Sequence, residues 1–410
     1  MPTKKLVVIG GGAAGFFCAV NAARLNPQLQ VTLIEKTGKL LSKVKVSGGG
    51  RCNVTHSCFD IAGMSRKYPR GGNFVKKAFH RFFTTDTISW FEERGVILKT
   101  EADGRMFPVT DSSQTIIDCL LNEAAQYGVE IVMNTEVKTV SKNDGLFQVT
   151  LADSRLLAPD YVCIACGGYP KSSMFEWLEA TGHSIEEPVP SLFTFNMPGH
   201  PIRELMGISV NAISIKIAGT KLEEKGPLLI THWGLSGPAV LKLSAWGAKE
   251  LVNMQYNFTV RINWMAGNDY YEQNLKEQWR YFRDLYASKK LINQNISQLP
   301  GRLWEFLLAQ SGIAKEMRFA DLSSKAENLL IKNLTDYTVE IKGKTTFKEE
   351  FVTAGGIKLA EIDPHSMMSR KTSNLFFAGE VTDVDGITGG FNFQYAWTSG
   401  WICANSINLL

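Results

Sequence analysis

Apolar and polar residues follow two periods along this chain, and its first stretch shows both. Residues Lys5 to Ile9 are mostly β-branched and apolar, as a buried parallel strand requires. Small and apolar residues then recur at helical spacing from Ala13 to Leu25, and a second apolar run covers Val31 to Ile34. A strand, a glycine turn, a helix and a strand within about 30 residues predict a right-handed crossover unit.

The alternation of helix and strand patterns continues to about residue 190. Helices are predicted from Thr84 to Arg94 and from Ser112 to Tyr127, the second with Asp111 as its N-cap. The run Asn143-Asp144-Gly145 predicts a hairpin turn between two alternating segments. The other predicted strands are Val96 to Lys99, Val129 to Met133, Val137 to Val140, Phe147 to Leu151 and Tyr161 to Ala165.

The pattern changes at Pro188-Val189-Pro190. Short alternating runs from about 191 to 265 predict antiparallel strands, and the chain becomes helical and aromatic from Asp269 to about Leu308. Strand-like runs return over Thr345 to Val352. We therefore expect an α/β fold in which a Rossmann-like domain (1-190 and 346-410) is interrupted by an inserted β-barrel-like substrate domain (191-345) with a helical subdomain at about 268-335.

Length and charge limit the classes of protein. A chain of 410 residues exceeds the usual single domain. The net charge is only +4, and the basic residues occur mostly as isolated pairs. Because no dense basic run is present, we expect no nucleic-acid partner.

The seven cysteines are scattered and odd in number, which is typical of a reduced intracellular protein. No run of about 18 apolar residues predicts a membrane span. No spacing of histidine, cysteine and carboxylate residues predicts a metal site. We expect a cytoplasmic monomer or homodimer that does not bind a membrane.

The glycine turn after the first strand predicts a dinucleotide site. Gly10 permits the tight turn, Gly12 lets the backbone approach a pyrophosphate, and Gly15 lets helix and strand pack closely. The helix opened by Ala13-Ala14 presents unpaired N–H groups to the phosphates. Glu35 ends the second strand, where it can accept hydrogen bonds from the adenosine ribose. A glycine turn that serves packing alone is the alternative.

Further segments carry a resemblance to a known family. The run Lys43 to Thr55 is similar to the K-L-L-x-S-G-G-G-R-C-N-x-T signature of the HI0933-like (YhiN-like) flavoproteins. Thr231 to Pro238, Thr353 to Ile357 and Gly379 to Gln394 agree with the same family. That family is similar to the aminoacetone-oxidase and BaiN-type NAD(P)/FAD-dependent oxidoreductases. The resemblance spans essentially the whole chain and implies a glutathione-reductase-type domain that binds FAD non-covalently.

The segments that carry the resemblance also have a physical interpretation. Ser47 to Thr55 combines three glycines with polar side chains, which suits the pyrophosphate and ribityl region, although an ordinary glycine loop is the alternative. The helix from Phe393 to Ala404 follows Gly390-Phe391-Asn392, so its N-terminus could face the flavin and favour the negative charge of the reduced ring. A helix that only docks on the sheet is the alternative there. The resemblance assigns ribityl hydrogen bonds to Glu380.

Together the glycine turn and the resemblance imply a set of cofactor contacts. These are Gly10, Gly12, Ala13, Ala14, Gly15, Glu35, Lys36, Lys43, Ser47, Gly48, Gly49, Arg51, Cys52, Asn53, Thr55, Val137, Ala165, Gly167, Gly379, Glu380, Gly389, Gly390, Phe391 and Asn392.

Several other residues invite a chemical role. Cys163 and Cys166 could form a redox pair, but residues three apart on a strand point to opposite faces, so we expect inert core thiols. Cys52 is expected to contact the cofactor or to pack, without thiol catalysis. His56 and His232 lie in signature segments and could meet substrate, although isolated histidines are usually structural.

The remaining cations of interest, Arg66, Lys67 and Arg70, are interpreted as a solvated basic stretch.

These observations predict an FAD-dependent oxidoreductase that transfers a hydride between a small-molecule substrate and the flavin N5. No second G-x-G-x-x-G is present, so NAD(P)H, a possible reductant, would have no Rossmann domain of its own. An amine oxidase that uses oxygen, an NAD(P)H-dependent reductase of unsaturated carbonyl compounds and an RNA-associated flavoprotein are the alternatives. The dispersed charge counts against RNA, and no residue stands out as the catalytic acid or base.

Overall fold

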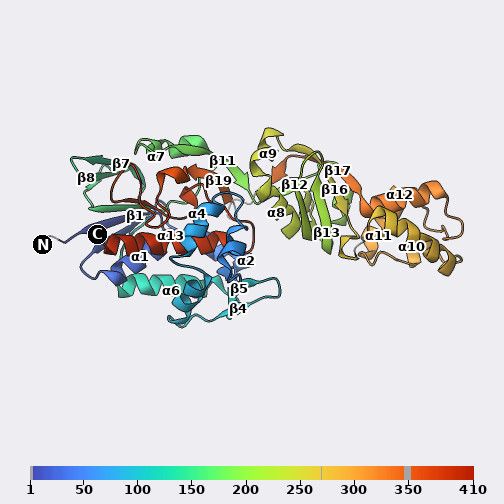
Figure 1. Ribbon diagram of the computed structural model, residues 1–410, viewed down its shortest axis with the longest axis horizontal. Helices are drawn as coiled ribbons and strands as arrows, with labels where there is room; N and C mark the ends of the chain where they lie inside the picture. The colour runs from blue at the N-terminus through green and yellow to red at the C-terminus, as the bar shows by residue number, and fades with distance from the viewer. Residues whose placement is uncertain (1–2, 269, 346–351) are drawn as a thin grey trace. The chain divides into compact units, whose positions relative to one another are not determined.

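The computed structural model describes residues 3–268, 270–345 and 352–410, which fold into two compact units. The first unit contains residues 3–191 and 352–410, and the second contains 192–345 (Figure 1). Each unit is described by itself.

A five-stranded parallel sheet forms the centre of the first unit, in the order β20-β10-β1-β2-β6. The apolar run Lys5–Ile9 becomes β1 because four of its five residues are buried between the layers. The strand order reverses at β1, and sheets of this kind bind ligands beside such a reversal, at the carboxyl ends of the strands. The predicted Rossmann-like fold is confirmed. The other strands are β2 (Gln30–Ile34), β6 (Glu130–Val132), β10 (Tyr161–Ile164) and β20 (Leu375–Phe377).

Two helices from opposite ends of the chain pack along each other on this sheet. Helix α1 (Ala13–Leu25) makes the first crossover, and α13 (Phe391–Asn408) lies beside it (Figure 1). A Cβ on Gly400 would lie 2.6 Å from the backbone oxygen of Ala14, so only glycine allows the helices to come this close. The C-terminal helix therefore packs in the same layer as the helix that follows the glycine turn.

Smaller elements surround the parallel sheet. The hairpin turn is confirmed, because Asp144 and Gly145 have φ of 49° and 83°, as a type I′ turn requires. The strands of the smaller sheets are β3 (Thr55–His56), β4 (Leu98–Thr100), β5 (Arg105–Pro108), β7 (Val137–Asn143), β8 (Leu146–Leu151), β9 (Leu156–Leu157), β11 (Ile185–Ser191) and β19 (Val352–Ile357). The helices are α2 (Ser42–Gly50), α3 (Ile61–Ser65), α4 (Gly72–Phe79), α5 (Thr84–Glu92), α6 (Ser113–Gln126) and α7 (Glu176–Glu179).

Three local predictions need correction. Asp111 is not the N-cap of α6, because it adopts a left-handed backbone with φ of 52°, and the Ser112 side chain accepts from the N–H of Gln114 instead. The glycines of the segment Ser47 to Thr55, for which no helix was predicted, form the kinked end of α2, where Gly48 and Gly49 leave the helical backbone region. Helix α13 begins at Phe391, two residues before the predicted start, because the sharp turn is completed by Gly390.

The second unit holds a seven-stranded antiparallel sheet in the order β17-β16-β13-β14-β15-β12-β18. Its two edges meet at Gly343, whose N–H donates to the Tyr256 carbonyl and whose own carbonyl accepts from Asn196, so the sheet closes like a barrel. The strands are β12 (Thr194–Asn196), β13 (Ser209–Ile217), β14 (Glu223–Ile230), β15 (Gly234–Ser236), β16 (Asn257–Asn263), β17 (Tyr337–Lys342) and β18 (Lys344–Thr345).

The predicted helical segment of this unit lies between β16 and β17, and its helices bury Trp279, Trp304 and Leu330 in the core of the unit. Most of the strand-like run predicted over Thr345 to Val352 lies at 346–351, outside the described residues, as does Asp269. The helices are α8 (Pro238–Trp246), α9 (Ala248–Asn253), α10 (Glu272–Leu285), α11 (Gly301–Gln310) and α12 (Ser324–Thr335).

Candidate functional site

The glycine turn lies at the carboxyl end of β1, and its three glycines have different reasons to be glycine. A Cβ on Gly10 would lie 2.4 Å from the Ala165 oxygen, and one on Gly15 would lie 1.9 Å from the Gly10 oxygen. A Cβ on Gly12 would meet nothing within 4 Å. The fold itself therefore requires Gly10 and Gly15, whereas Gly12 borders open space at the start of α1.

The N-terminus of α1 is free of competing side chains. No side chain caps this helix, and its first turn has no acidic residue, so its N–H groups and positive dipole end can receive an anion. Ala13 and Ala14 form the first turn of the helix. This arrangement fits a pyrophosphate approaching the backbone at Gly12.

Glu35 follows β2 and faces the glycine turn. One carboxylate oxygen accepts from the Gly11 N–H at 2.9 Å, and the other accepts from the N–H and hydroxyl of Thr37 at 2.9 and 2.8 Å. Because a carboxylate offers about four acceptor positions, these three bonds leave about one for a ribose hydroxyl. Glu35 thus positions the turn and can also bind a sugar.

The segment Ser47 to Thr55 crosses the left-handed backbone region repeatedly. Gly48, Gly49 and Cys52 have φ of 59°, 70° and 62°. A Cβ on Gly49 would meet nothing within 4 Å, whereas one on Gly48 would lie 2.7 Å from the Phe107 ring. This segment therefore combines one glycine required by packing with one that borders open space.

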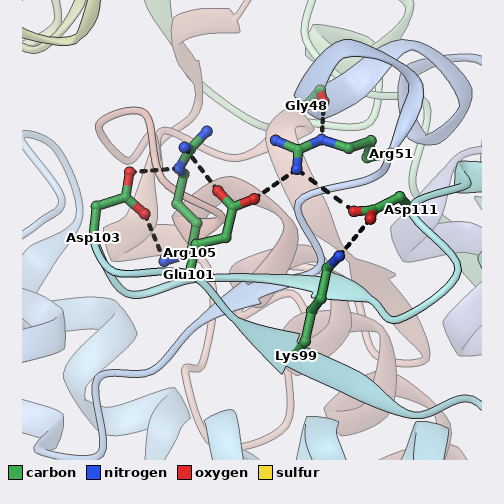
Figure 2. A network of polar contacts seen from close by, with 7 residues as sticks. All are labelled: Gly48, Arg51, Lys99, Glu101, Asp103, Arg105 and Asp111. Atoms are coloured by element: carbon green, nitrogen blue, oxygen red, sulfur yellow. Dashed lines mark hydrogen bonds and ion pairs between the residues drawn. The ribbon is translucent and has the colours of Figure 1, made fainter.

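Arg51 lies in a charge network rather than in that open space (Figure 2). Its guanidinium donates to Glu101 at 2.6 Å and to the Gly48 carbonyl at 3.3 Å, and it lies 4.0 Å above the Phe107 ring. Glu101 also accepts from Arg105 at 2.9 Å. The guanidinium predicted to bind the cofactor thus fastens the glycine segment to strands β4 and β5.

Asp111 closes the other end of the same network. It lies 3.5 Å from Arg51 and is paired with Lys99 (Figure 2). The hydrogen bond from Lys99 lowers the pKa of the Asp111 carboxyl. The residue that does not cap α6 therefore helps to hold Arg51.

Replacing Glu101 by glutamine is expected to weaken FAD binding a few-fold while lowering the free energy of unfolding by less than about 1 kcal/mol, because an exposed pair is worth little by itself. The reason is that Arg51 would lose the carboxylate that holds it beside Gly48. Flavin-fluorescence titration and thermal unfolding measure the two effects. Asp153→Asn, which breaks an exposed pair with Arg155, is the matched control, and equal FAD affinity in both variants would contradict the role of Glu101.

Glu380 is held on both sides by residues distant in sequence. One carboxylate oxygen accepts from the Thr353 N–H at 2.7 Å, and the other pairs with the Lys43 ammonium at 2.5 Å. A Cβ on the preceding Gly379 would lie 2.8 Å from the Cβ of Ala14, so this segment packs tightly against α1. The structure therefore brings three predicted contacts from both ends of the chain to one place.

Thr353 is a residue that we did not predict. Its hydroxyl is buried and has no hydrogen-bond partner in the described part of the protein, although buried hydroxyls normally have one. A Cβ on Gly168 would lie 2.6 Å from this hydroxyl and 2.8 Å from Glu380. The glycine-rich run that follows Thr353 was the available signal.

The turn before α13 is fixed by the side chains around it. A Cβ on Gly390 would lie 2.5 Å from the Thr55 carbonyl oxygen, and Gly389 has φ of 135°. The Asn392 amide accepts from the Gly386 N–H at 2.7 Å and donates to the Gly386 carbonyl at 2.9 Å. The Asn392 side chain therefore holds the loop, and the Thr55 hydroxyl is likewise occupied, since it donates to Gln394 at 2.6 Å.

Aromatic residues pack against the same turn. Phe391 stacks on His56 with ring centroids 4.8 Å apart, and its carbonyl accepts from the Tyr68 hydroxyl at 2.6 Å. The Asn53 amide, oriented with its oxygen toward Gly390, accepts from the Gly390 N–H at 3.0 Å. His56 is therefore a packing partner of a predicted contact.

The remaining predicted contacts are dispersed: Ala165, Gly167 and Lys36 follow strands of the parallel sheet, whereas Val137 and Ser47 lie in other elements. Ala165 donates its N–H to Ile9 at 2.8 Å, and a Cβ on Gly167 would meet nothing within 4 Å. Lys36 is exposed, and its ammonium lies 5.6 Å from the centre of the Tyr169 ring. Val137 begins β7, and Ser47 donates its hydroxyl to the Val44 carbonyl at 3.1 Å.

The thiols of this region are protonated at neutral pH. Burial raises the pKa of Cys52 to about 12 and that of Cys166 to about 11. Cys163 is fully buried, and none of the seven cysteines forms a disulfide. These environments agree with inert thiols.

The residues present fit an elongated dinucleotide cofactor. Open space adjoins Gly12, Gly49 and Gly167, and the Thr353 hydroxyl lacks a partner. Helix α13, like α1, has neither a side-chain cap nor an acidic first turn. No cluster of three potential metal ligands occurs within the described ranges, and no helix there has the length and apolarity needed to cross a membrane.

Comparisons with known proteins agree with this picture. The model of the HI0933-like protein Rossmann domain matches residues 4–406. The ribosomal RNA dihydrouridine synthase of Escherichia coli K12 is 32% identical, covering 98% of this chain and 97% of that protein. The enzyme of the same name from Haemophilus influenzae is 30% identical, and the 3-dehydro-bile acid delta(4,6)-reductase of Clostridium scindens is 26% identical, with 98% of both chains covered in each case.

Solved structures share the fold. The 3-ketosteroid-delta4-(5alpha)-dehydrogenase of Rhodococcus jostii RHA1 gives a TM-score of 0.51 at 13% identity, covering 98% of this chain and 97% of that one. A flavocytochrome c3 fumarate reductase also gives 0.51, at 15% identity, covering 100% of this chain and 79% of that one. The chain therefore belongs to the HI0933-like family and is an FAD-dependent oxidoreductase.

Proposed function

We propose that this enzyme reduces a carbon–carbon double bond conjugated to a carbonyl group, using FAD held by the glycine segments of the first unit. The proposal rests on the names of two relatives that match 98% of the chain, because each name refers to the reduction of a double bond of this kind. Dihydrouridine is uridine whose ring double bond, conjugated to a carbonyl, has been saturated. A delta(4,6)-reductase of a 3-dehydro bile acid likewise acts on double bonds conjugated to a ketone.

The residues of the first unit have distinct parts in this proposal. Bound FAD, reduced by a donor such as NAD(P)H, would supply the hydride for the carbon farther from the carbonyl, and the carbon next to the carbonyl would take up a proton that derives from water. Gly12 and the N-terminus of α1 would receive the pyrophosphate, and Glu35 the adenosine ribose. Lys43 neutralises Glu380, whose free lone pairs, with the Thr353 hydroxyl, would bind the ribityl chain.

The positive end of α13 is proposed to favour reduction of the cofactor. The helix begins after Gly390 with uncapped N–H groups. An electrostatic field of this kind stabilises negative charge on a ligand near the helix N-terminus. Tyr68, Asn392 and His56 keep this N-terminus in place through the contacts described above.

A uridine in RNA is the first candidate substrate. The two relatives named for ribosomal RNA are 32% and 30% identical to the chain, against 26% for the bile-acid reductase. This candidate departs from the small molecule that the dispersed charge predicts. The bile-acid reductase supports a small unsaturated ketone as the second candidate, and we assign selection of the substrate to the second unit, since all predicted cofactor contacts lie in the first.

An anaerobic experiment tests the proposal. The holoenzyme is reduced with NADPH or NADH, and the flavin absorbance is followed after addition of an unmodified ribosomal RNA transcript or of a 3-dehydro-delta(4,6) bile acid. We expect one of these acceptors to reoxidise the flavin and to gain two hydrogens, as measured by mass spectrometry. If oxygen alone reoxidises the flavin, the enzyme is an oxidase and the proposal is wrong.

Replacing Glu35 by alanine is expected to weaken FAD binding by about ten- to a hundredfold, since hydrogen bonds to a charged group contribute about 1.5–3 kcal/mol. Glutamine should give a smaller loss, because its amide oxygen can still accept from Gly11. Titration of the apoprotein with FAD measures the effect, and circular dichroism confirms the fold. Glu179→Gln on the exposed side of α7 is the control, and unchanged FAD affinity in the alanine variant would refute the ribose assignment.

A further inference from the structure

One segment of the first unit carries positive charge without any acidic residue. Between Asp60 and Asp86 the chain has no aspartate or glutamate, and it contains the following lysines and arginines: Arg66, Lys67, Arg70, Lys76, Lys77 and Arg81. All except Arg70 are exposed, and no carboxylate of the described residues lies within ion-pair distance of any of these exposed cations. Other exposed cations of the first unit, such as Lys138 and Arg155, have an acidic neighbour in the sequence and pair with it.

This basic segment is attached directly to the turn that precedes α13. The Lys67 carbonyl accepts from the Ile387 N–H at 3.0 Å, and the Tyr68 hydroxyl donates to Phe391 at 2.6 Å. A Cβ on Gly71 would lie 2.6 Å from the Val384 side chain. The exposed cations are therefore held beside the segment that we assign to the flavin, and α4 packs against α13 (Figure 1).

A groove runs along the same segment. A cavity of about 650 Å³ lies between α4 and the loop around residue 360, with Lys77 on one side and Arg370 on the other. Phe74, Leu359 and Pro364 contribute its apolar lining. Arg370 lies 3.5 Å from Asp363, so Lys77 is the unpaired cation of the groove. Cations beside an apolar surface suit a nucleotide, because the cations can bind its phosphate and the apolar surface can pack against its base.

We propose that the exposed cations of residues 66–81 contact the phosphates of an RNA substrate beside the flavin site. This inference rests on the uridine candidate of the proposed function. RNA carries one negative charge per nucleotide, whereas a small unsaturated ketone needs no field of unpaired cations. Because the cations lie on one short segment held by the flavin turn, they would bind the nucleotides that flank the reacting base.

The test compares two double variants of the oxidised holoenzyme. Lys76→Gln/Lys77→Gln removes two cations of α4, and Lys138→Gln/Arg155→Gln removes two exposed cations of the small β7-β8-β9 sheet of the first unit as the control. Binding of a fluorescently labelled, unmodified ribosomal RNA transcript is measured by anisotropy over a range of salt concentrations. FAD content and the flavin spectrum show whether the cofactor site is intact.

We expect the α4 variant to bind the transcript about tenfold more weakly at low salt. The slope of log K against log salt concentration should become less steep by about 1.4, or about 0.7 for each lost phosphate contact. The control should bind like the wild type, and both should keep their flavin spectrum. Equal loss in the control, an unchanged affinity in the α4 variant, or wild-type protein without salt-dependent RNA binding would each overturn the proposal.

Turnover separates this inference from the proposed function. If the wild type binds RNA through α4 but forms no dihydrouridine in it, the binding surface stands and the reaction is wrong. If the wild type reduces the transcript and the α4 variant binds and reduces it equally well, the reaction stands and the surface is wrong.

Discussion

Replacing Gly12 by alanine is expected to give a folded protein that has lost most of its affinity for FAD. The new methyl group would meet no atom of the protein within 4 Å, and Gly12 already has φ of −91°, which alanine tolerates. The same methyl group would occupy the space that a pyrophosphate needs to approach the backbone. We expect affinity to fall about a hundredfold, which corresponds to about 2.8 kcal/mol.

The apoprotein should remain within about 1 kcal/mol of the wild type in its free energy of unfolding, as measured by urea denaturation. Gly15→Ala is the informative contrast, because its methyl group would lie 1.9 Å from the Gly10 oxygen and would separate β1 from α1. That variant should lose both stability and FAD. If Gly12→Ala retains FAD with wild-type affinity, the cofactor does not approach this turn.

Replacing Arg70 by methionine is expected to lower the free energy of unfolding by about 3–5 kcal/mol, because it leaves a buried carboxylate without its cation. Asp385 is fully buried, Arg70 pairs with it through two nitrogens, and Ser191 donates to it at 2.8 Å. The loss should also loosen the turn before α13 and weaken FAD binding. Urea denaturation and flavin titration measure the two effects.

The pH dependence of this variant gives a sharper check. Burial raises the pKa of Asp385, and the charge of Arg70 is the largest influence that opposes the rise. Without Arg70 the folded state favours the protonated form of Asp385. The free energy of unfolding should therefore lie furthest below that of the wild type at neutral pH, where this carboxyl would otherwise be charged. This deficit should shrink as the pH falls and Asp385 takes up a proton. A double variant, Arg70→Met with Asp385→Leu, should recover part of the stability at all pH values, and a constant deficit in Arg70→Met would contradict the buried-charge explanation.

The glycine turn and the position of Glu35 beside it were predictable because their signals are local. A glycine at Gly10, Gly12 and Gly15 after an apolar strand, with Glu35 after the next strand, predicts the turn before any contact is known. The hairpin at Asp144 was predictable for the same reason. The prediction of Asp111 as the N-cap of α6 was wrong, because Asp111 and Ser112 are both good N-cap residues. Asp111 pairs with Lys99 of β4, and Ser112 caps the helix instead.

The roles of polar side chains in the signature segments were not predictable. Arg51, Thr55 and Asn392 occur in segments typical of a flavin site. In the structure their side chains form hydrogen bonds within the protein, with Glu101, Gln394 and Gly386 respectively. A sequence shows that a residue can donate hydrogen bonds, but any acceptor that the fold brings near can take them.

The order of strand, turn and helix, the glycine positions and the family were determined by the sequence alone, because periodicity and backbone freedom act over a few residues. Only the tertiary structure decided which distant residues meet. Lys43 and Glu380 are 337 positions apart, and Arg70 and Asp385 are 315 apart. Any of many acidic residues could neutralise Lys43 or Arg70. Glu380 and Asp385 become the partners because both ends of the chain pack on one parallel sheet. That packing also places the unpaired cations of α4 beside the turn of α13.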